Sequence, residues 1–230
     1  MRKTLSIILA LILLLLFLGC DNAAEPTQAQ INPTIHESAN HDVTPLPWNL
    51  LLVNPWNPLP DDHAIQLKEL RNGYCVDERI YPDLQEMFDN ARAENIQPLI
   101  VSAYRTYDKQ SQLYQDKVSS YLDEGYTQNQ AEEMAAKWVA KPNHSEHQTG
   151  LAIDINAESG SNDDVYEWLS KNSYKYGFIL RYPNEKTEIT GIHYEPWHYR
   201  YVGKQAAQYI NEKQITLEEY LAEQTTPLLG

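Results

Sequence analysis

Histidines gather with two acidic residues in one stretch of the chain. Four of the seven histidines fall between residues 144 and 198, where Asp154 and Glu195 also lie. Imidazole nitrogens and carboxylate oxygens are the usual protein ligands of catalytic zinc, together with cysteine. The four histidines are His144, His147, His193 and His198. Their clustering marks this stretch as the first place to look for a metal site.

One part of this stretch places an acid inside an apolar run. Leu151 to Ile155 reads as a strand, and Asp154 stands between two isoleucines within it. An ionised carboxylate in such a strand is costly unless another group offsets its charge, and a metal ion does so. Gly150 permits a tight backbone path from His147, in the preceding loop, to the strand. We therefore predict that His147 and Asp154 bind the same ion.

The rest of the candidate site is the segment Glu195-Pro196-Trp197-His198, in which His198 begins another strand. Two histidines and one carboxylate are a recurring ligand set for catalytic zinc, which keeps a fourth position for water. Zinc makes that water more acidic, and a free carboxylate nearby accepts its proton. We predict Zn²⁺ held by His147, Asp154 and His198, with Glu195 at the mouth of the site as general base and later acid. The residues alone leave one alternative, structural histidines around a buried Asp–His hydrogen bond.

These segments resemble the D-Ala-D-Ala carboxypeptidase family of the vancomycin-resistance type, which is related to the D,D- and L,D-carboxypeptidases of peptidoglycan metabolism. The family pattern is Ser-x-His, two residues, Gly, three residues, Asp, and later Glu-x-x-His. This chain carries it as Ser145, His147, Gly150, Asp154, Glu195 and His198. The resemblance covers roughly residues 60–210 and extends to Ser102–Thr106, Gln110, Leu113-Tyr114 and Trp197–Gly203.

The resemblance implies roles for further residues. Arg105 would grip the terminal carboxylate of a peptide or stabilise the oxyanion formed on attack. Ser145 and Gln110 are candidate substrate contacts. Trp197 is expected to wall the zinc pocket, although a packed core indole is an equally good interpretation. His144 and His193 stay outside the predicted ligand set.

The pattern of apolar residues predicts an α+β fold, because helices and antiparallel-looking strands alternate irregularly. The resemblance adds a fold of the hedgehog and D,D-peptidase type, with a small antiparallel sheet that carries the zinc and helices that flank it. A helix should open at Pro82-Asp83 and bury Leu84, Met87, Phe88 and Ala91. The other expected elements are helices at 108–123, 128–140 and 163–175, strands at 98–101, 178–180 and 197–202, and a C-terminal helical pair.

The N-terminal part of the chain reads as a targeting segment followed by a linker. Residues 1–20 have a basic start and a short apolar run, as in a secretory signal peptide. Their end, Phe17-Leu18-Gly19-Cys20, resembles a bacterial lipoprotein signal, so we expect lipidation of Cys20; ordinary secretion or an uncleaved anchor is the alternative. Residues 21–47 are polar and Pro-containing and predict a flexible tether. The catalytic domain is then residues 48–224.

Composition limits the partners of the chain. Its net charge of −14 opposes binding to nucleic acid, which depends on Lys and Arg. From the signal-like N-terminus we expect a monomeric lipoprotein on the outer face of a bacterial cell membrane. The family resemblance implies that it acts on peptidoglycan stem peptides. The predicted reaction is zinc-dependent D,D-carboxypeptidase cleavage of the C-terminal D-Ala. The alternatives are an L,D-carboxypeptidase acting on tetrapeptide stems, an endopeptidase that cuts cross-links, and a non-catalytic zinc-containing wall-binding domain.

Overall fold

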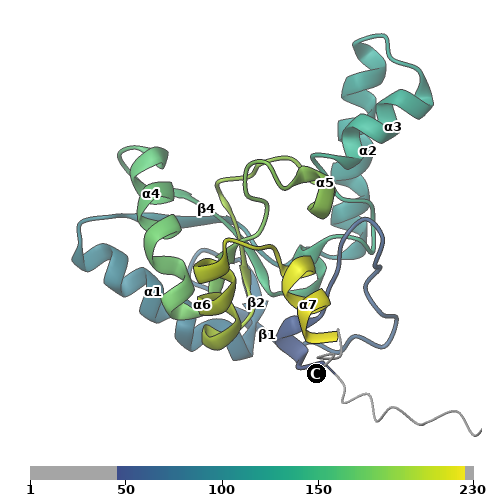
Figure 1. Ribbon diagram of the computed structural model, residues 1–230. Helices are drawn as coiled ribbons and strands as arrows, with labels where there is room; N and C mark the ends of the chain where they lie inside the picture. Colours follow the sequence, from purple (N-terminus) through teal and green to yellow (C-terminus); the bar gives the residue numbers. More distant parts are fainter. Residues whose placement is uncertain (1–45, 226–230) are drawn as a thin grey trace, which may run out of the picture. The chain divides into compact units, whose positions relative to one another are not determined.

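A four-stranded antiparallel sheet lies at the centre of the structure, a computed structural model that describes residues 46–225 (Figure 1). Its strand order is β3-β4-β6-β5. The strands are β3 (Pro98–Ser102), β4 (Ala152–Ala157), β5 (Phe178–Leu180) and β6 (His198–Tyr201). The predicted α+β class and small antiparallel sheet are confirmed. A separate two-stranded ribbon, β1 (Leu67–Glu69) with β2 (Cys75–Asp77), was not expected from the sequence.

The central strand β4 divides its side chains between an apolar face and a polar face. Ile153 and Ile155 are fully buried and belong to the main hydrophobic core, to which helices α1 (Tyr81–Ala93) and α4 (Asn162–Asn172) contribute. Successive side chains of a strand point to opposite faces of the sheet, so Asp154 points away from this core. The apolar pattern of β4 thus fixes the side on which a polar site can form.

Strand β6 repeats this division. Tyr199 and Tyr201 pack in the same core as the isoleucines of β4. His198 and Arg200 therefore share the opposite face with the carboxylate of β4. One face of the sheet packs against the hydrophobic core, and the other carries Asp154, His198 and Arg200.

The predicted helices agree with the structure in position and differ at some ends. Helix α1 buries Leu84, Met87, Phe88 and Ala91, as its apolar period requires. The expected helix at 163–175 ends at Asn172 and continues as a 3-10 turn, Ser173–Tyr176. The C-terminal pair is α6 (Lys204–Lys213) and α7 (Leu217–Thr225), which share a second apolar cluster. The remaining short elements are α5 (Thr187–Thr190) and 3-10 turns at Trp48–Leu50, Glu78–Ile80 and Glu146–Thr149.

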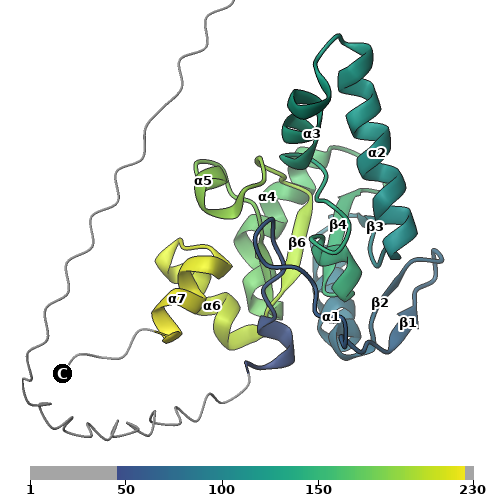
Figure 2. The same cartoon turned by 90° about the vertical axis from the view of Figure 1, so that its right-hand side faces the viewer.

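Helices α2 (Tyr107–Asp123) and α3 (Gln128–Ala136) form a hairpin that stands out from the sheet in both views (Figures 1 and 2). Helix α3 is four residues shorter than predicted. The chain leaves the helix after Ala136 because tertiary contacts hold the following residues elsewhere. The backbone N–H of His193 donates to the carbonyl of Lys137 at 3.0 Å, and the rings of Trp138 and His193 lie 4.7 Å apart.

The predictions for the N-terminal region fall almost entirely outside the described residues. The signal peptide at 1–20, the lipidated Cys20 and all but the last two residues of the 21–47 tether lie there. Within residues 46–225, no helix combines the length and the apolar character needed to cross a membrane.

Candidate metal centre

The pairing of β4 with β6 brings two of the predicted ligands together. Asp154 lies directly opposite His198 in the antiparallel register. Both side chains are on the polar face of the sheet, where Nδ1 of His198 is 3.2 Å from Oδ1 of Asp154. Two residues separated by 44 positions in sequence are therefore placed side by side by strand pairing alone.

The third predicted ligand comes from the 3-10 turn Glu146–Thr149. The turn ends at Gly150 in a left-handed conformation, with φ of 72°, so that the chain can enter β4 directly. Nε2 of His147 lies 3.4 Å from Oδ1 of Asp154. Its Nδ1 donates to the carbonyl oxygen of Ala103 at 2.7 Å, because a carbonyl can only accept. The lone pair of His147 is consequently on Nε2, the atom that faces the aspartate.

The three side chains fit a metal ion. One ligand atom from each of His147, Asp154 and His198 lies within 4.8 Å of the others, and all three residues are buried. Oδ1 of Asp154 has no hydrogen-bond partner among residues 46–225, although it is buried. Burial acts to raise the pKa of Asp154, but the two imidazoles outweigh it and hold that pKa well below its usual range. Two nitrogens and one oxygen with an open side form the donor set of a catalytic zinc site.

The predicted base, Glu195, lies beside this set. Its Oε2 is 3.5 Å from Nδ1 of His198, and only 7% of the residue is exposed, so it is more buried than a position at the mouth of the site suggests. Burial raises the pKa of Glu195 to about 7, with Asp154 adding to the rise and His198 opposing it. A carboxylate whose pKa lies near neutrality is suited to accept and return a proton.

The guanidinium of Arg105 contacts the second carboxylate oxygen of Asp154, the one that does not face the histidines. Its Nη2 donates to Oδ2 of Asp154 at 3.0 Å, and its Nε donates to the hydroxyl of Ser102 at 2.9 Å. Its Nη1 lies 3.3 Å from Oε1 of Gln110. Arg105 also lines the cleft described next, so a ligand carboxylate there would meet a fixed cation.

A cleft of about 210 Å³ opens over these groups. Ser145 and Trp197 line it. Contact of Ser145 with a substrate stays a prediction. Gln110 is fully buried and is not part of the lining; its amide nitrogen donates to the carbonyl of Ala140 at 2.6 Å while its oxygen supports Arg105. The remaining lining residues are Leu113, Trp138, Val139, Ala140, Tyr182 and Ile192.

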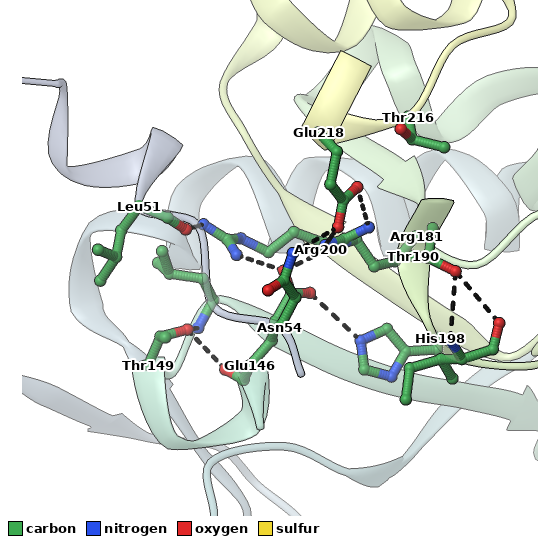
Figure 3. Close-up of polar contacts among 12 residues, drawn as sticks. Leu51, Asn54, Glu146, Thr149, Arg181, Thr190, His198, Arg200, Thr216 and Glu218 are labelled. Atoms are coloured by element: carbon green, nitrogen blue, oxygen red, sulfur yellow. Dashed lines mark hydrogen bonds and ion pairs between the residues drawn. The ribbon is translucent and has the colours of Figure 1, made fainter. Parts of the chain in front are cut away.

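A buried network of charged side chains, which was not predicted from the sequence, lies next to the ligand His198 (Figure 3). Oε1 of Glu146 accepts from Nε of Arg181 at 2.8 Å and from Nη1 of Arg200 at 2.7 Å. Burial opposes ionisation of Glu146, but the two guanidiniums keep its pKa well below the usual range. The sequence did contain a signal for this network. Arg181 directly follows the apolar strand β5 and Arg200 lies within β6, and arginines at such buried positions need buried acidic partners.

The two histidines excluded from the ligand set lie apart from it. Nδ1 of His144 is hydrogen-bonded to the carbonyl oxygen of Asn54 at 2.9 Å. His193 packs its ring against Trp138.

Comparison with known proteins identifies the family of this chain. The family model for VanY D-alanyl-D-alanine carboxypeptidases matches residues 74–204, which contain every predicted ligand and the base. The chain belongs to this family. The resemblance noted in the sequence is thereby confirmed.

Individual members of the family are similar over most of the chain. A D-alanyl-D-alanine carboxypeptidase of Enterococcus faecalis is 51% identical over 176 residues, which are 76% of this chain and 66% of that relative. The match thus spans slightly less than two thirds of the relative's length.

Solved structures share the fold. A vancomycin-resistance D,D-pentapeptidase, VanY, was crystallised as a mutant with Zn(II); it is 51% identical, with a TM-score of 0.74 over 76% of this chain and 99% of that chain. VanYB in complex with D-alanine-D-alanine is 50% identical, with a TM-score of 0.75 over 76% and 98%. The LD-carboxypeptidase LdcB is more distant, at 36% identity and a TM-score of 0.61 over 76% and 86%.

Proposed function

We propose that this protein is a zinc-dependent D,D-carboxypeptidase that removes the C-terminal D-Ala from peptidoglycan stem peptides. The observation that carries the proposal is the convergence of His147, Asp154 and His198 within 4.8 Å, with Glu195 beside them and Arg105 in the same cleft. The Zn(II) and D-alanine-D-alanine complexes of relatives about 50% identical support the metal and the substrate class.

Each residue of the site has a place in the reaction. Zinc held by His147, Asp154 and His198 would polarise the scissile carbonyl and make a water molecule more acidic. Glu195 accepts the proton of the attacking water and returns it to the nitrogen of the departing D-Ala. Burial raises the pKa of this carboxyl above its usual value, which suits it to hold the proton between the two transfers.

Arg105 gives the site its preference for the end of a peptide. Its guanidinium is held in place by Asp154 and Ser102 on one side of the cleft. A free C-terminal carboxylate bound there gains charge-assisted hydrogen bonds that an internal peptide bond lacks. This position of a fixed cation favours an exopeptidase over the endopeptidase alternative.

The test uses defined stem peptides. The zinc-loaded protein should release one D-Ala from a pentapeptide ending in D-Ala-D-Ala, and Glu195→Gln should lower kcat by about 10²- to 10⁴-fold while it retains zinc. An amidated pentapeptide is the control for recognition of the free carboxylate. Ser161→Ala, at a helix cap outside the cleft, is the matched variant that should keep wild-type turnover.

The outcomes separate the rival functions. Release of D-Ala from the tetrapeptide alone would assign the L,D activity, for which the likeness to LdcB gives a structural precedent. Cleavage of the amidated stem would indicate an endopeptidase. Zinc binding without any hydrolysis would leave a wall-binding domain.

We further propose that the enzyme is a monomer tethered to the outer face of the cell membrane through a lipid on Cys20. The support is the basic start, the apolar run and the Cys20 context of residues 1–20. Growth with a labelled fatty acid should label the wild-type protein and leave a Cys20→Ala variant unlabelled. A wild-type protein without label would rule out this anchor.

A further inference from the structure

A buried, charge-balanced group of four side chains lies behind the metal centre. It consists of Glu146, Arg181, Arg200 and Glu218. The two arginines and Glu146 are at most 1% exposed. Removing so many charges from water is costly, and packed apolar residues often give equal or greater stability. A contribution to stability is therefore a weak explanation for this group, whereas its contact with the metal centre offers another.

The contact with the metal centre is made by Glu146. Its Oε1 is occupied by both guanidiniums, whereas its Oε2 has no hydrogen-bond partner among residues 46–225. That oxygen faces Nε2 of His198 at 3.6 Å. Nε2 is likewise buried without a hydrogen bond in the described part of the chain. A hydrogen bond between these two atoms would satisfy both, since a carboxylate accepts and an imidazole N–H donates.

The two histidine ligands use their ring nitrogens in opposite ways. His147 donates from Nδ1 to a backbone carbonyl and presents Nε2 to Asp154. His198 presents Nδ1 to Asp154 and turns Nε2 towards Glu146. A neutral imidazole carries its proton on one nitrogen only, so an outer acceptor at one nitrogen leaves the lone pair on the other.

We propose that Glu146 is a positioning residue of the metal site, held by Arg181 and Arg200 so that it keeps the proton of His198 on Nε2 and the lone pair on Nδ1. The inference rests on the zinc site proposed above. The arginines are themselves fixed from outside the site. Arg200 donates to the carbonyls of Asn49 and Leu51 at 3.1 and 2.7 Å.

The other arginine, Arg181, connects the same group of charged side chains to the C-terminal helix α7. Arg181 donates to both carboxylate oxygens of Glu218 on α7, at 2.9 and 2.7 Å (Figure 3). Asn54 donates to Glu218 as well, at 3.0 Å. The first and last parts of the described chain thus meet at the arginines behind one metal ligand.

The test compares Glu146→Gln with Glu218→Gln. In the first variant the amide oxygen can satisfy the arginines only if the NH₂ group faces Nε2 of His198, which reverses the polarity of that contact. We expect its zinc dissociation constant, measured by competition with a chromophoric chelator, to rise about 10- to 100-fold. The visible spectrum of the Co²⁺-loaded protein should change with it. Glu218→Gln removes a charge from the same network without touching His198, and its zinc affinity should stay within about twofold of wild type.

Glu146→Asp covers the case in which the glutamine variant does not fold, because it retains a carboxylate for the arginines but withdraws it from His198. We expect a folded protein with weakened zinc binding. Unchanged zinc affinity and Co²⁺ spectrum in a folded Glu146 variant would overturn the inference. Equal weakening by Glu218→Gln would overturn it too. If the wild-type protein binds no zinc, the proposed function fails instead.

Discussion

Each of the three candidate ligands is oriented by a group on the side away from the ion. His147 is held by the carbonyl of Ala103, and Asp154 is held by the guanidinium of Arg105 through its second oxygen. His198 faces the carboxylate of Glu146. Such outer contacts fix the ring and carboxylate orientations that metal binding requires. At the scale of single residues, the site therefore consists of three ligands and their three supports.

Arg105 both holds Asp154 and lines the cleft, and we expect that lysine cannot replace it. The guanidinium bonds Asp154 and Ser102 and still faces the cleft, whereas an ammonium is a point charge on a flexible stem. Arg105→Lys should lower kcat/KM for a free stem peptide by about 10- to 100-fold, equivalent to the loss of a charge-assisted bond of about 1.5–3 kcal/mol. Steady-state kinetics measure this.

The matched control for that substitution is Arg79→Lys. Arg79 is also paired with a buried acid, Asp77, but lies outside the cleft. Its kcat/KM should remain within about twofold of wild type. Equal kinetics for the two lysine variants would contradict a role for Arg105 in substrate binding.

At the scale of elements, the site is a product of strand alternation and register. The isoleucines of β4 must face the core, and this requirement places Asp154 on the opposite face. The antiparallel pairing then sets His198 opposite it. A shift of one residue in either strand would exchange the buried and ligand faces, so the core and the metal site specify the same register.

The turn between His147 and β4 depends on a residue without a side chain. Gly150 has φ of 72°, and a Cβ added there would come within 2.9 Å of the backbone nitrogen of Asp77. Gly150→Ala should destabilise the fold by about 1–3 kcal/mol and weaken zinc binding, because the turn must move together with His147. Thermal unfolding and chelator competition measure the two effects.

Gly160 is a control that separates the effect of backbone strain from the effect of a steric clash with neighbouring atoms. Gly160 has φ of 85°, but a Cβ there meets no atom within 4 Å. Gly160→Ala should cost about 1 kcal/mol of stability and leave zinc affinity unchanged. If both variants retain wild-type zinc affinity, the close approach at Gly150 is not what positions His147.

The elements that sequence could predict are those whose signal is local. The apolar period of α1 and the ligand pattern around Asp154 can be read from neighbouring residues, and the structure contains both as expected. The end of α3 depends on a contact with His193, more than fifty residues away, which no local pattern contains. The β1–β2 ribbon was missed because the three residues of β1 are all exposed and show no alternation.

The partners of buried polar side chains were the feature least predictable from the sequence. Glu146 stood within the recognised pattern, but nothing near it reveals that it is buried against Arg181 and Arg200. Gln110 was predicted as a substrate contact, whereas its side chain is enclosed behind Arg105. Burial and pairing of polar side chains are properties of the tertiary structure, so a single sequence identifies the candidates without their partners.

At the scale of the whole molecule, the metal centre joins segments that are distant in the chain. Its ligands come from a turn, a central strand and a second strand. The groups behind them reach the residues around Leu51 and helix α7. An unfolded chain cannot hold this arrangement, so zinc should bind the folded state with strong preference.

Zinc should therefore raise the unfolding temperature of the protein. At a free concentration 100 times the dissociation constant, a ligand specific for the folded state adds about 2.7 kcal/mol. For a domain of this size that corresponds to an increase of about 5–11 °C, which a chelator should reverse. In His198→Ala, one ligand is removed and the increase should largely disappear, although the apoprotein still unfolds cooperatively. An unfolding temperature of the wild-type protein that is the same with zinc and with chelator would mean that these segments do not meet at a metal ion.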